Sequence, residues 1–474
     1  MISRREFLEL GAAAFAFGGC ETIPILGGGL PKLRLGVMSD IHLTWNVDEP
    51  GSCERIEKAL RFYRDRNVDG VVIAGDIADW GFVGQLVEFG ELWRKVFPDD
   101  KAPDGHRVER LFVGGNHDLV GPYEPFMWKG RSILEQKSEF IKTIGIEKAW
   151  EKAFGEAYEP IWLKEVKGYS FTGAHWMCEK GLKDFLAANR AKINPDLPYF
   201  HVQHPHPLGT VYQGMFSERS WNYDQGAAFA ALASFPNAVA LSGHTHLPLT
   251  DERSIWQGEF TSVATASLSY VWLMDGHENT NPGKGRVAQM PEINPWPWQD
   301  PDRGHHLMYF EVFDDRIEIE RLSAFDLGRL GPNWVVPTAA ARRPYEYKSR
   351  SRSFPPPEFP QGAAVAVSKP YPGKNRKGVA TDQVDVRFPT ASAGKSRAFD
   401  YEVAVEQQAD GDWKPQLVKK VWSPTYHKSL ADEATEANCV FAVDELPKGA
   451  CRFAVTPLSS FGTRGRTLVS KEVI

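Results

Sequence analysis

The most restrictive feature of this 474-residue sequence is that five apolar runs, far apart in the chain, each end in a cluster of polar side chains. The runs lie at residues 32–40, 69–76, 110–118, 199–207 and 238–247. Apolar residues at helical spacing lie between the early runs, at 56–66 and near 86–97. Continuous apolar strands that alternate with helices predict an α/β fold with a largely parallel sheet covered on both faces. Because each polar cluster follows a strand, we expect all of them at the carboxyl edge of the sheet, where such sheets bind ligands.

The pattern changes in the second half of the chain. Residues 305–322 predict a hairpin with one solvated face, which would close a first domain over 32–347. Residues 348–362 are basic and then rich in Pro, which predicts a linker without a core. Short alternating strands separated by turn residues predict a small all-β sandwich over 363–474.

The first residues resemble an export signal. Arg4 and Arg5 precede a short apolar stretch that ends at Cys20, a pattern similar to a twin-arginine signal. The stretch is shorter than the about 20 residues that a membrane-spanning helix needs. Cys20 also resembles a lipoprotein box, although Phe17 stands where Leu is more usual. We expect residues 1–31 to be signal and arm, and the protein to be exported to the periplasm or cell envelope. Two alternatives stay open: a lipid anchor on Cys20 and an uncleaved amphipathic arm.

Charge and cysteine content narrow the function classes. Lys plus Arg number 55 against 61 for Asp plus Glu, so no overall basic field favours nucleic acid, and only a local basic groove stays open. Cys53, Cys178, Cys439 and Cys451 share no CxxC spacing, which argues against a thiolate zinc site. Cys439 and Cys451 flank a predicted strand–turn–strand, as either a disulfide or two buried small hydrophobes.

The polar clusters together offer carboxylate oxygen, amide oxygen and imidazole nitrogen, a set suited to Mn²⁺, Fe or Zn²⁺. They hold more candidate ligands than one catalytic zinc uses, which favours two metal ions. In the stretches 40–42 and 244–246, strand alternation would aim the outer two side chains at one point. Gly75 and Gly115 precede candidate ligands and permit backbone shapes that a β-carbon would resist. The candidate residues are Asp40, His42, Asp76, Asp79, Asn116, His117, His204, His206, His244 and His246.

The order of these motifs resembles the calcineurin-like metallophosphoesterases, whose pattern is D-x-H, G-D-x-x-D, G-N-H-D or -E, H, and G-H-x-H. The match runs from Asp40 to His246 with no core motif residue missing. The resemblance implies a sandwich of two mixed β-sheets flanked by helices, and a phosphate-ester substrate. It also implies a ligand set: one metal is held by Asp40, His42 and His246, the other by Asn116, His204 and His244, and Asp76 bridges both. His117 would face the substrate instead of a metal.

A dinuclear phosphoester hydrolase, either a phosphatase or a phosphodiesterase, is the function that follows. A metal-bridging hydroxide would attack phosphorus, and His117 would protonate the leaving group as general acid. In the related phosphoprotein phosphatases the second Asp of G-D-x-x-D orients the catalytic His, which makes Asp79 the candidate partner of His117. Asp79 stands where purple acid phosphatases carry Tyr, and Trp80 where phosphoprotein phosphatases carry Arg. We therefore expect neither a tyrosinate–iron centre nor an arginine clamp on phosphate, and phosphoprotein substrates are disfavoured.

Two other functions are weighed against this one. The chain could be a catalytically inactive phospho-ligand or partner-binding protein on the same scaffold, but such a protein has no physical need for a nonligand His beside the metals. A redox metalloprotein is a weaker alternative, since no Tyr or thiolate ligand is present.

Several residues have a plainer interpretation. His201, His305 and His306 are expected to pack, His206 to lie outside the metals, and Asp118 to cap a turn. His175 stays unassigned. The long aromatic segment 269–301 is either a substrate lid or, slightly favoured, an insertion that packs on the linker or second domain. The last domain resembles a fibronectin type III sandwich through residues 446–465, which implies positioning or contact with another protein or a glycan.

Overall fold

The computed structural model describes residues 29–43, 52–119, 144–211, 224–271, 277, 304–338, 343–375, 378–394, 396–425, 429–431 and 435–471. The predicted export signal, Cys20 and most of the segment 269–301 lie outside the described residues. Within the described ranges, no helix combines the length and the apolar character needed to cross a membrane.

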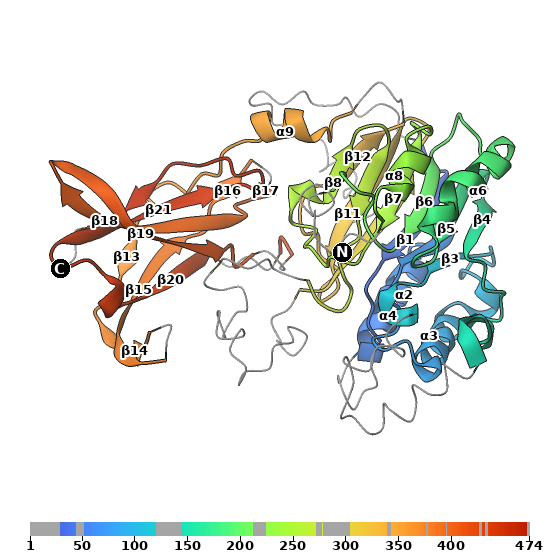
Figure 1. The fold of residues 1–474 in the computed structure, drawn as a ribbon, viewed down its shortest axis with the longest axis horizontal. Coiled ribbons are helices and arrows are strands. Elements are labelled where there is room, and N and C mark those ends of the chain that lie inside the picture. The colour runs from blue at the N-terminus through green and yellow to red at the C-terminus, as the bar shows by residue number, and fades with distance from the viewer. Residues whose placement is uncertain are drawn as a thin grey trace, which may run out of the picture. The chain divides into compact units, whose positions relative to one another are not determined.

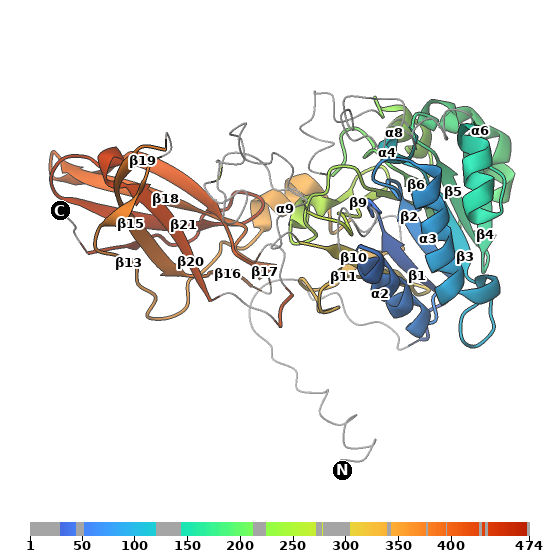
Figure 2. The ribbon, with the colours of Figure 1, turned by 90° about the horizontal axis from the view of Figure 1, so that it is seen from below.

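The first sheet has six strands in the order β12-β11-β10-β1-β2-β3 (Figure 1). Strands β1, β2 and β3 run parallel, and β10 joins β1 antiparallel, so the sheet is mixed. Helices α2 and α3, predicted from apolar spacing, are confirmed and lie on one face of this sheet (Figure 2). The bounds are β1 (Leu33–Met38), α2 (Ser52–Asp65), β2 (Gly70–Ala74), α3 (Val83–Val96), β3 (Glu109–Val113), β10 (His306–Val312), β11 (Arg316–Ser323) and β12 (Trp334–Pro337).

The second sheet also has six strands, in the order β4-β5-β6-β7-β9-β8. Its four inner strands are parallel, and β4 and β8 are antiparallel at the two edges. Helices α6 and α8 lie beside it (Figure 1). The bounds are β4 (Ile161–Val166), β5 (Tyr169–Ala174), α6 (Leu182–Asn189), β6 (Tyr199–Gln203), α8 (Ala227–Leu232), β7 (Ala238–Ser242), β8 (Ile255–Gln257) and β9 (Thr261–Ala264).

The two sheets pack face to face, and each is covered by helices on its outer face. Along β2, Val71 and Ile73 join the core beneath α2 and α3, whereas Val72 and Ala74 join the core between the sheets. This alternation follows from the two-residue period of a strand and buries both faces. The predicted α/β sandwich of two mixed sheets with flanking helices is therefore the observed fold.

The hairpin formed by β10 and β11 is present, but its predicted solvated face is wrong for β10. Met308 and Phe310 lie in the core between the sheets, and Leu307 and Tyr309 lie in the core beneath the helices. The reason is that β10 pairs with β1 and so occupies the interior of the sheet.

The predicted linker is not free of structure. It contains helix α9 (Tyr347–Ser353), and the Arg350 guanidinium lies 2.7 Å from the Glu252 carboxylate. Glu252 also bonds Arg321 at 2.8 Å, so the helix is tied to a buried charged network. Further along, Phe359 joins the core of the last domain.

Within the described residues, the C-terminal region forms two four-stranded antiparallel sheets around a common core, together with the two-stranded sheet of β16 and β17. Val386 and Phe441 come from one sheet and Val403 and Phe453 from the other. Cys439 and Cys451 are both buried in this core. The strands are β13 (Ala366–Val367), β14 (Tyr371–Lys374), β15 (Ala380–Pro389), β16 (Ser392–Ala393), β17 (Ser396–Arg397), β18 (Asp400–Ala409), β19 (Asp412–Trp422), β20 (Glu436–Ala442), β21 (Cys451–Leu458) and β22 (Leu468–Val469).

Candidate metal centre

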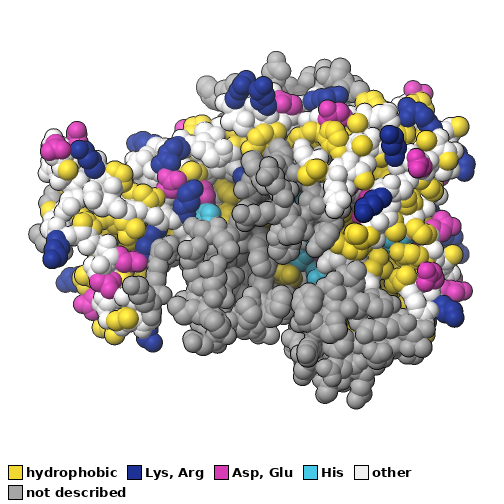
Figure 3. Space-filling model, viewed as in Figure 1, with side chains coloured by type: hydrophobic (Ala, Val, Ile, Leu, Met, Phe, Trp, Pro, Cys, Tyr) yellow, Lys and Arg dark blue, Asp and Glu magenta, His cyan; other side chains and the backbone are white. Residues whose placement is uncertain are grey.

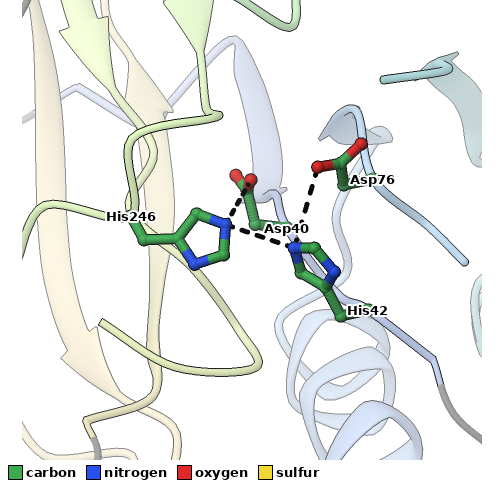
Figure 4. A group of neighbouring side chains, drawn as sticks. All are labelled: Asp40, His42, Asp76 and His246. Atoms are coloured by element: carbon green, nitrogen blue, oxygen red, sulfur yellow. Dashed lines mark hydrogen bonds and ion pairs between the residues drawn. The ribbon is translucent and has the colours of Figure 1, made fainter. Parts of the chain in front are cut away.

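The polar clusters that follow β1, β2, β3, β6 and β7 meet at one edge of the two sheets. One group of possible ligand atoms, all within 4.8 Å of one another, comes from Asp40, His42, Asp76 and His246 (Figure 4). A second group comes from Asp76, His204 and His244, and a third from His42, Asp79 and His117. The predicted convergence of distant segments is thus present in the structure.

Five of the predicted ligands have a left-handed backbone: Asp40 (φ 48°), His42 (φ 44°), Asp76 (φ 51°), His244 (φ 73°) and His246 (φ 54°). Residues other than Gly seldom adopt this conformation, which costs on the order of 1–3 kcal/mol each. Such a concentration at one edge marks a site where the surrounding fold enforces an arrangement of side chains.

This geometry corrects the predicted role of strand alternation. Strand β1 ends at Met38 and β7 ends at Ser242, so the D-x-H and H-x-H motifs lie beyond the strands. Left-handed turns, and not the pleat of a strand, aim these side chains inward.

In the first group, three side chains face one point. The Nε2 atom of His246 lies 2.8 Å from Asp40 Oδ1 and 3.2 Å from His42 Nε2 (Figure 4). His42 donates Nδ1–H to the Asp79 carboxylate at 3.0 Å, and His246 donates Nδ1–H to the Tyr270 carbonyl at 3.0 Å. Because each Nδ1 carries a proton, each Nε2 is available as a lone pair, as in metal-binding histidines.

The second group repeats this arrangement. His204 donates Nδ1–H to the Ala74 carbonyl at 2.7 Å, so its Nε2 faces the cluster. That Nε2 lies 3.1 Å from Asp76 Oδ2 and 3.0 Å from Asn116 Oδ1. The His244 ring lies beside it, with the centroids 4.9 Å apart. These buried donors fit divalent cations, and the oxygen and imidazole set excludes a soft thiolate centre.

Electrostatics favour a positive charge among these donors. Burial would raise the pKa of Asp40, but the charges of His246 and His204 lower it to about 2. Burial would lower the pKa of His204, yet the Asp76 and Asp40 carboxylates raise it to about 9. Burial lowers the pKa of His244 to about 3, which leaves it a neutral imidazole. Two buried carboxylates thus attract one positive charge to the cluster, carried by a proton or by a cation.

His117 and Asp79 differ from the predicted pairing. The Asp79 carboxylate bonds His42, whereas His117 donates Nδ1–H to the backbone carbonyl of Asp79 at 2.6 Å. The backbone N–H of Asp79 donates to the Leu43 carbonyl at 3.1 Å, which brings the Asp79 loop beside the segment that carries His42. His117 is therefore oriented by the main chain of Asp79, and the Asp79 side chain orients His42.

The Asp79→Asn variant should consequently bind metal more weakly and leave the role of His117 intact. Loss of the charged partner of His42 should weaken Mn²⁺ binding by roughly tenfold, as expected for an outer partner of a metal-binding His. Isothermal titration with Mn²⁺ measures this change. Rates for a series of aryl and alkyl esters, at saturating Mn²⁺, should keep the wild-type dependence on leaving-group pKa. A steeper dependence with unchanged Mn²⁺ affinity would return Asp79 to the role predicted from the sequence.

Asp118 connects two of the loops. Its buried carboxylate accepts hydrogen bonds from the backbone N–H groups of Ile77 (3.0 Å), Ala78 (2.7 Å) and Gly115 (2.9 Å). The predicted turn cap is therefore also a brace between the loops that follow β2 and β3.

The two glycines before the ligands are required for different reasons. Gly75 has φ 97°, and a Cβ there would lie 2.2 Å from Nδ1 of His204. A Cβ on Gly115 would lie 2.2 Å from Asp76 Oδ1, so close approach rather than backbone conformation excludes a side chain.

Sequence reasoning missed two aromatic residues at the cluster. The Trp176 ring centroid lies 5.3 Å from that of His244, and the Tyr270 centroid lies 4.3 Å from that of His246. Trp176 follows β5, and Tyr270 comes after β9. The rule that functional residues follow the ends of parallel strands could have found Trp176, which comes shortly after β5. Tyr270 lies further from the end of β9 and contacts His246 through its carbonyl, so that rule does not reach it.

The other histidines make contacts outside the ligand groups. His206 bonds the hydroxyls of Ser242 and Thr245, each at 2.7 Å. His175 accepts from the backbone N–H of Gly114 at 2.8 Å, which supplies the role that the sequence left unassigned. The three histidines that the sequence predicted to pack, His201, His305 and His306, bond neighbouring groups in the core.

The fold is an α/β sandwich whose edge carries clustered side chains of a kind that can hold metal ions. Residues 33–248 match the model of the family described as calcineurin-like phosphoesterase. Over these residues the chain is similar to the calcineurin-like phosphoesterases, in agreement with the resemblance that the motifs carry. The comparison with curated proteins finds no match.

The solved structures that the chain matches share little sequence with it. A dimetal phosphatase from Danio rerio is 11% identical, with a TM-score of 0.37, and the match covers 65% of this chain and 100% of that one. A purple acid phosphatase from yellow lupin (Lupinus luteus) seeds is 14% identical, with a TM-score of 0.38, covering 64% of this chain and 53% of that one. A predicted phosphoesterase from Streptococcus pneumoniae is 15% identical, with a TM-score of 0.28, covering 64% and 97%. At these values the similarities say nothing about the substrate.

Proposed function

We propose that this protein is a dinuclear-metal-dependent phosphoester hydrolase. The observation that carries the proposal is that Asp76, a buried carboxylate, belongs to two groups of ligand atoms at once. A carboxylate shared in this way suits two adjacent cations. We assign Asp40, His42 and His246 to one cation, and Asn116, His204 and His244 to the other, with Asp76 common to both.

The chemistry divides between the cations and the chain. When bound, two cations would neutralise phosphate oxygens and lower the pKa of a water molecule toward about 7. The chain holds the donors in place through the carbonyls of Ala74 and Tyr270 and the carboxylate of Asp79. His117 would hold a proton for the departing alkoxide, since its Nδ1 is occupied by the Asp79 carbonyl and its Nε2 is the other nitrogen that can carry one.

The residue at position 80 bears on the substrate class. Trp80 is 4% exposed, and its backbone N–H donates to the side chain of Gln85 at 3.1 Å. A buried indole cannot form the paired hydrogen bonds to phosphate that a guanidinium forms, so we infer that phosphoproteins are poor substrates. Figure 3 shows Lys and Arg interspersed with Asp and Glu among the described residues of the face drawn, an arrangement that does not favour a polyanion.

Two further parts of the proposal concern the ends of the chain. We propose export to the periplasm or cell envelope on the basis of the Arg4-Arg5 motif, with Cys20 as a candidate lipid attachment site. We also propose that the C-terminal β-region is a fibronectin type III-like domain, which its antiparallel strands support.

Chelation and substrate assays test the proposed hydrolase. The Mn²⁺-loaded protein should hydrolyse at least one of an aryl monoester, an aryl diester, a nucleotide and a phospholipid. Removal of metal with EDTA should abolish the rate and lower the melting temperature, because a ligand at 100 times its Kd stabilises a protein by about 2.7 kcal/mol. Added Mn²⁺ should restore both. Metal binding without hydrolysis of any of these substrates would instead favour the inactive binding protein.

A further inference from the structure

A short segment after β9 connects the metal cluster with the C-terminal sandwich. Tyr270 contacts the cluster through its carbonyl, which accepts from His246, and through its ring, which lies 4.3 Å from His246 and 5.7 Å from His42 between centroids. The next residue, Val271, is 5% exposed and packs against Trp422 at the end of β19. Adjacent residues thus contact the ligands and the sandwich.

His277 makes a second contact with the sandwich. His277 stacks on Trp422 with ring centroids 3.7 Å apart and planes 16° apart, and its Nε2 lies 2.8 Å from Asp400 Oδ2. The Phe399 ring packs edge-on against the Trp422 ring, with the two ring centroids 5.0 Å apart. These contacts all lie within the compact unit Pro31–Ile474. Trp422, Phe399 and Asp400 form the docking surface for Val271 and His277.

We propose that the C-terminal sandwich raises the metal affinity of the site by holding Tyr270 against His246. Tyr270 would be a positioning residue. Its carbonyl keeps the proton on Nδ1 of His246, so that Nε2 faces Asp40. This inference rests on the proposed metal site and adds to it a role for a domain that contributes no ligand.

The competing explanation is that the phosphoesterase domain holds Tyr270 by itself. Two backbone hydrogen bonds support this explanation in part. The Tyr270 N–H donates to the Ser267 hydroxyl at 2.9 Å, and the Val271 N–H donates to the Gly304 carbonyl at 2.8 Å. Those bonds hold the backbone N–H groups of Tyr270 and Val271 but do not involve their side chains. The Val271 side chain is covered by Trp422 and Phe399, so removal of Trp422 tests whether the sandwich matters.

The experiment compares Mn²⁺ binding by the full chain with that of two variants, Trp422→Ala and His277→Ala. Each should raise the Kd for Mn²⁺ by about tenfold, the lower end of the range for outer partners of metal ligands. The rate at limiting Mn²⁺ should fall, and saturating Mn²⁺ should restore most of it. Val418→Ala is the matched control, because Val418 lies on the same strand, β19, but is 50% exposed. It should bind Mn²⁺ as the wild type does.

The outcomes separate this inference from the proposed function. Wild-type Mn²⁺ affinity in both variants would overturn the inference and leave the hydrolase proposal standing. A wild-type protein that binds no Mn²⁺ would contradict the proposed function itself. Thermal unfolding shows whether Trp422→Ala still folds. If it does not, His277→Ala decides, since His277 is not part of any strand of the sandwich.

Discussion

The Asp76→Asn variant should lose bound metal and hydrolytic rate together. Asp76 is 1% exposed, and its carboxylate faces both His42 and His204. In the wild type the His117 backbone N–H donates to Asp76 Oδ1 at 2.9 Å. An Asn at position 76 keeps an oxygen that can accept this hydrogen bond but lacks the negative charge. Since metal-based charge stabilisation contributes several kcal/mol to catalysis, the expected fall in kcat/KM is about 10³-fold. Elemental analysis of the purified variant and initial rates at fixed Mn²⁺ measure the two losses.

Asp251→Asn is the matched control for this charge removal. Asp251 is also 1% exposed, but its carboxylate pairs with Arg253 at the start of a short 3₁₀ turn, away from the ligand groups. This variant should keep metal content and rate. An Asp76→Asn protein with two bound metals and full activity would remove the argument for a shared carboxylate.

The His117→Ala variant should show the opposite pattern, with metal retained and rate lost. His117 lies outside the two groups of ligand atoms that share Asp76, with its ring centroid 4.5 Å from that of His42, and its Nδ1 is bonded to a backbone carbonyl. General acid catalysis contributes about 10²–10⁴-fold, and the contribution grows as the leaving group becomes more basic. Alkyl esters should therefore lose far more rate than 4-nitrophenyl esters.

A leaving-group series provides the internal control for His117→Ala. If the variant lost the same factor with every ester, His117 would act on binding and not on proton transfer. If it lost metal instead, His117 would belong among the ligands. Together with Asp79→Asn, which should alter affinity alone, the two variants separate the residue that holds a proton from the residue that orients a ligand.

The sheets and the location of the site could be predicted from the sequence because both depend on local pattern. The apolar residues 70–74 and 238–242 form buried strands, and the polar residues that follow such parallel strands meet at one edge. The placement of β10 next to β1 could not be predicted in the same way. It depends on a pairing across more than 260 residues, which buried a face that the hairpin pattern predicts to be solvated.

Within the site, residue identity was predictable and side-chain direction was not. The choice of Asp79 between His42 and His117 is decided by a backbone contact with Leu43, which the motif does not encode. Tyr270 was missed because its contribution to His246 comes from a carbonyl group that every residue carries. Contacts made by main-chain groups are hard to predict from the sequence, because every residue type carries the same groups.

The left-handed backbone at Asp40, His42, Asp76, His244 and His246 has a consequence for ion selection. Donor atoms on such constrained segments cannot move apart easily, so the distance from these atoms to a bound ion would be nearly fixed by the backbone. Zn²⁺ takes imidazole and carboxylate ligands at about 2.0–2.2 Å, whereas Ca²⁺ needs 2.3–2.6 Å and six to eight oxygens. A stiff main chain would therefore disfavour Ca²⁺ because the donor distances would be too short for it. The nitrogen donors disfavour Ca²⁺ as well, since it prefers oxygen ligands.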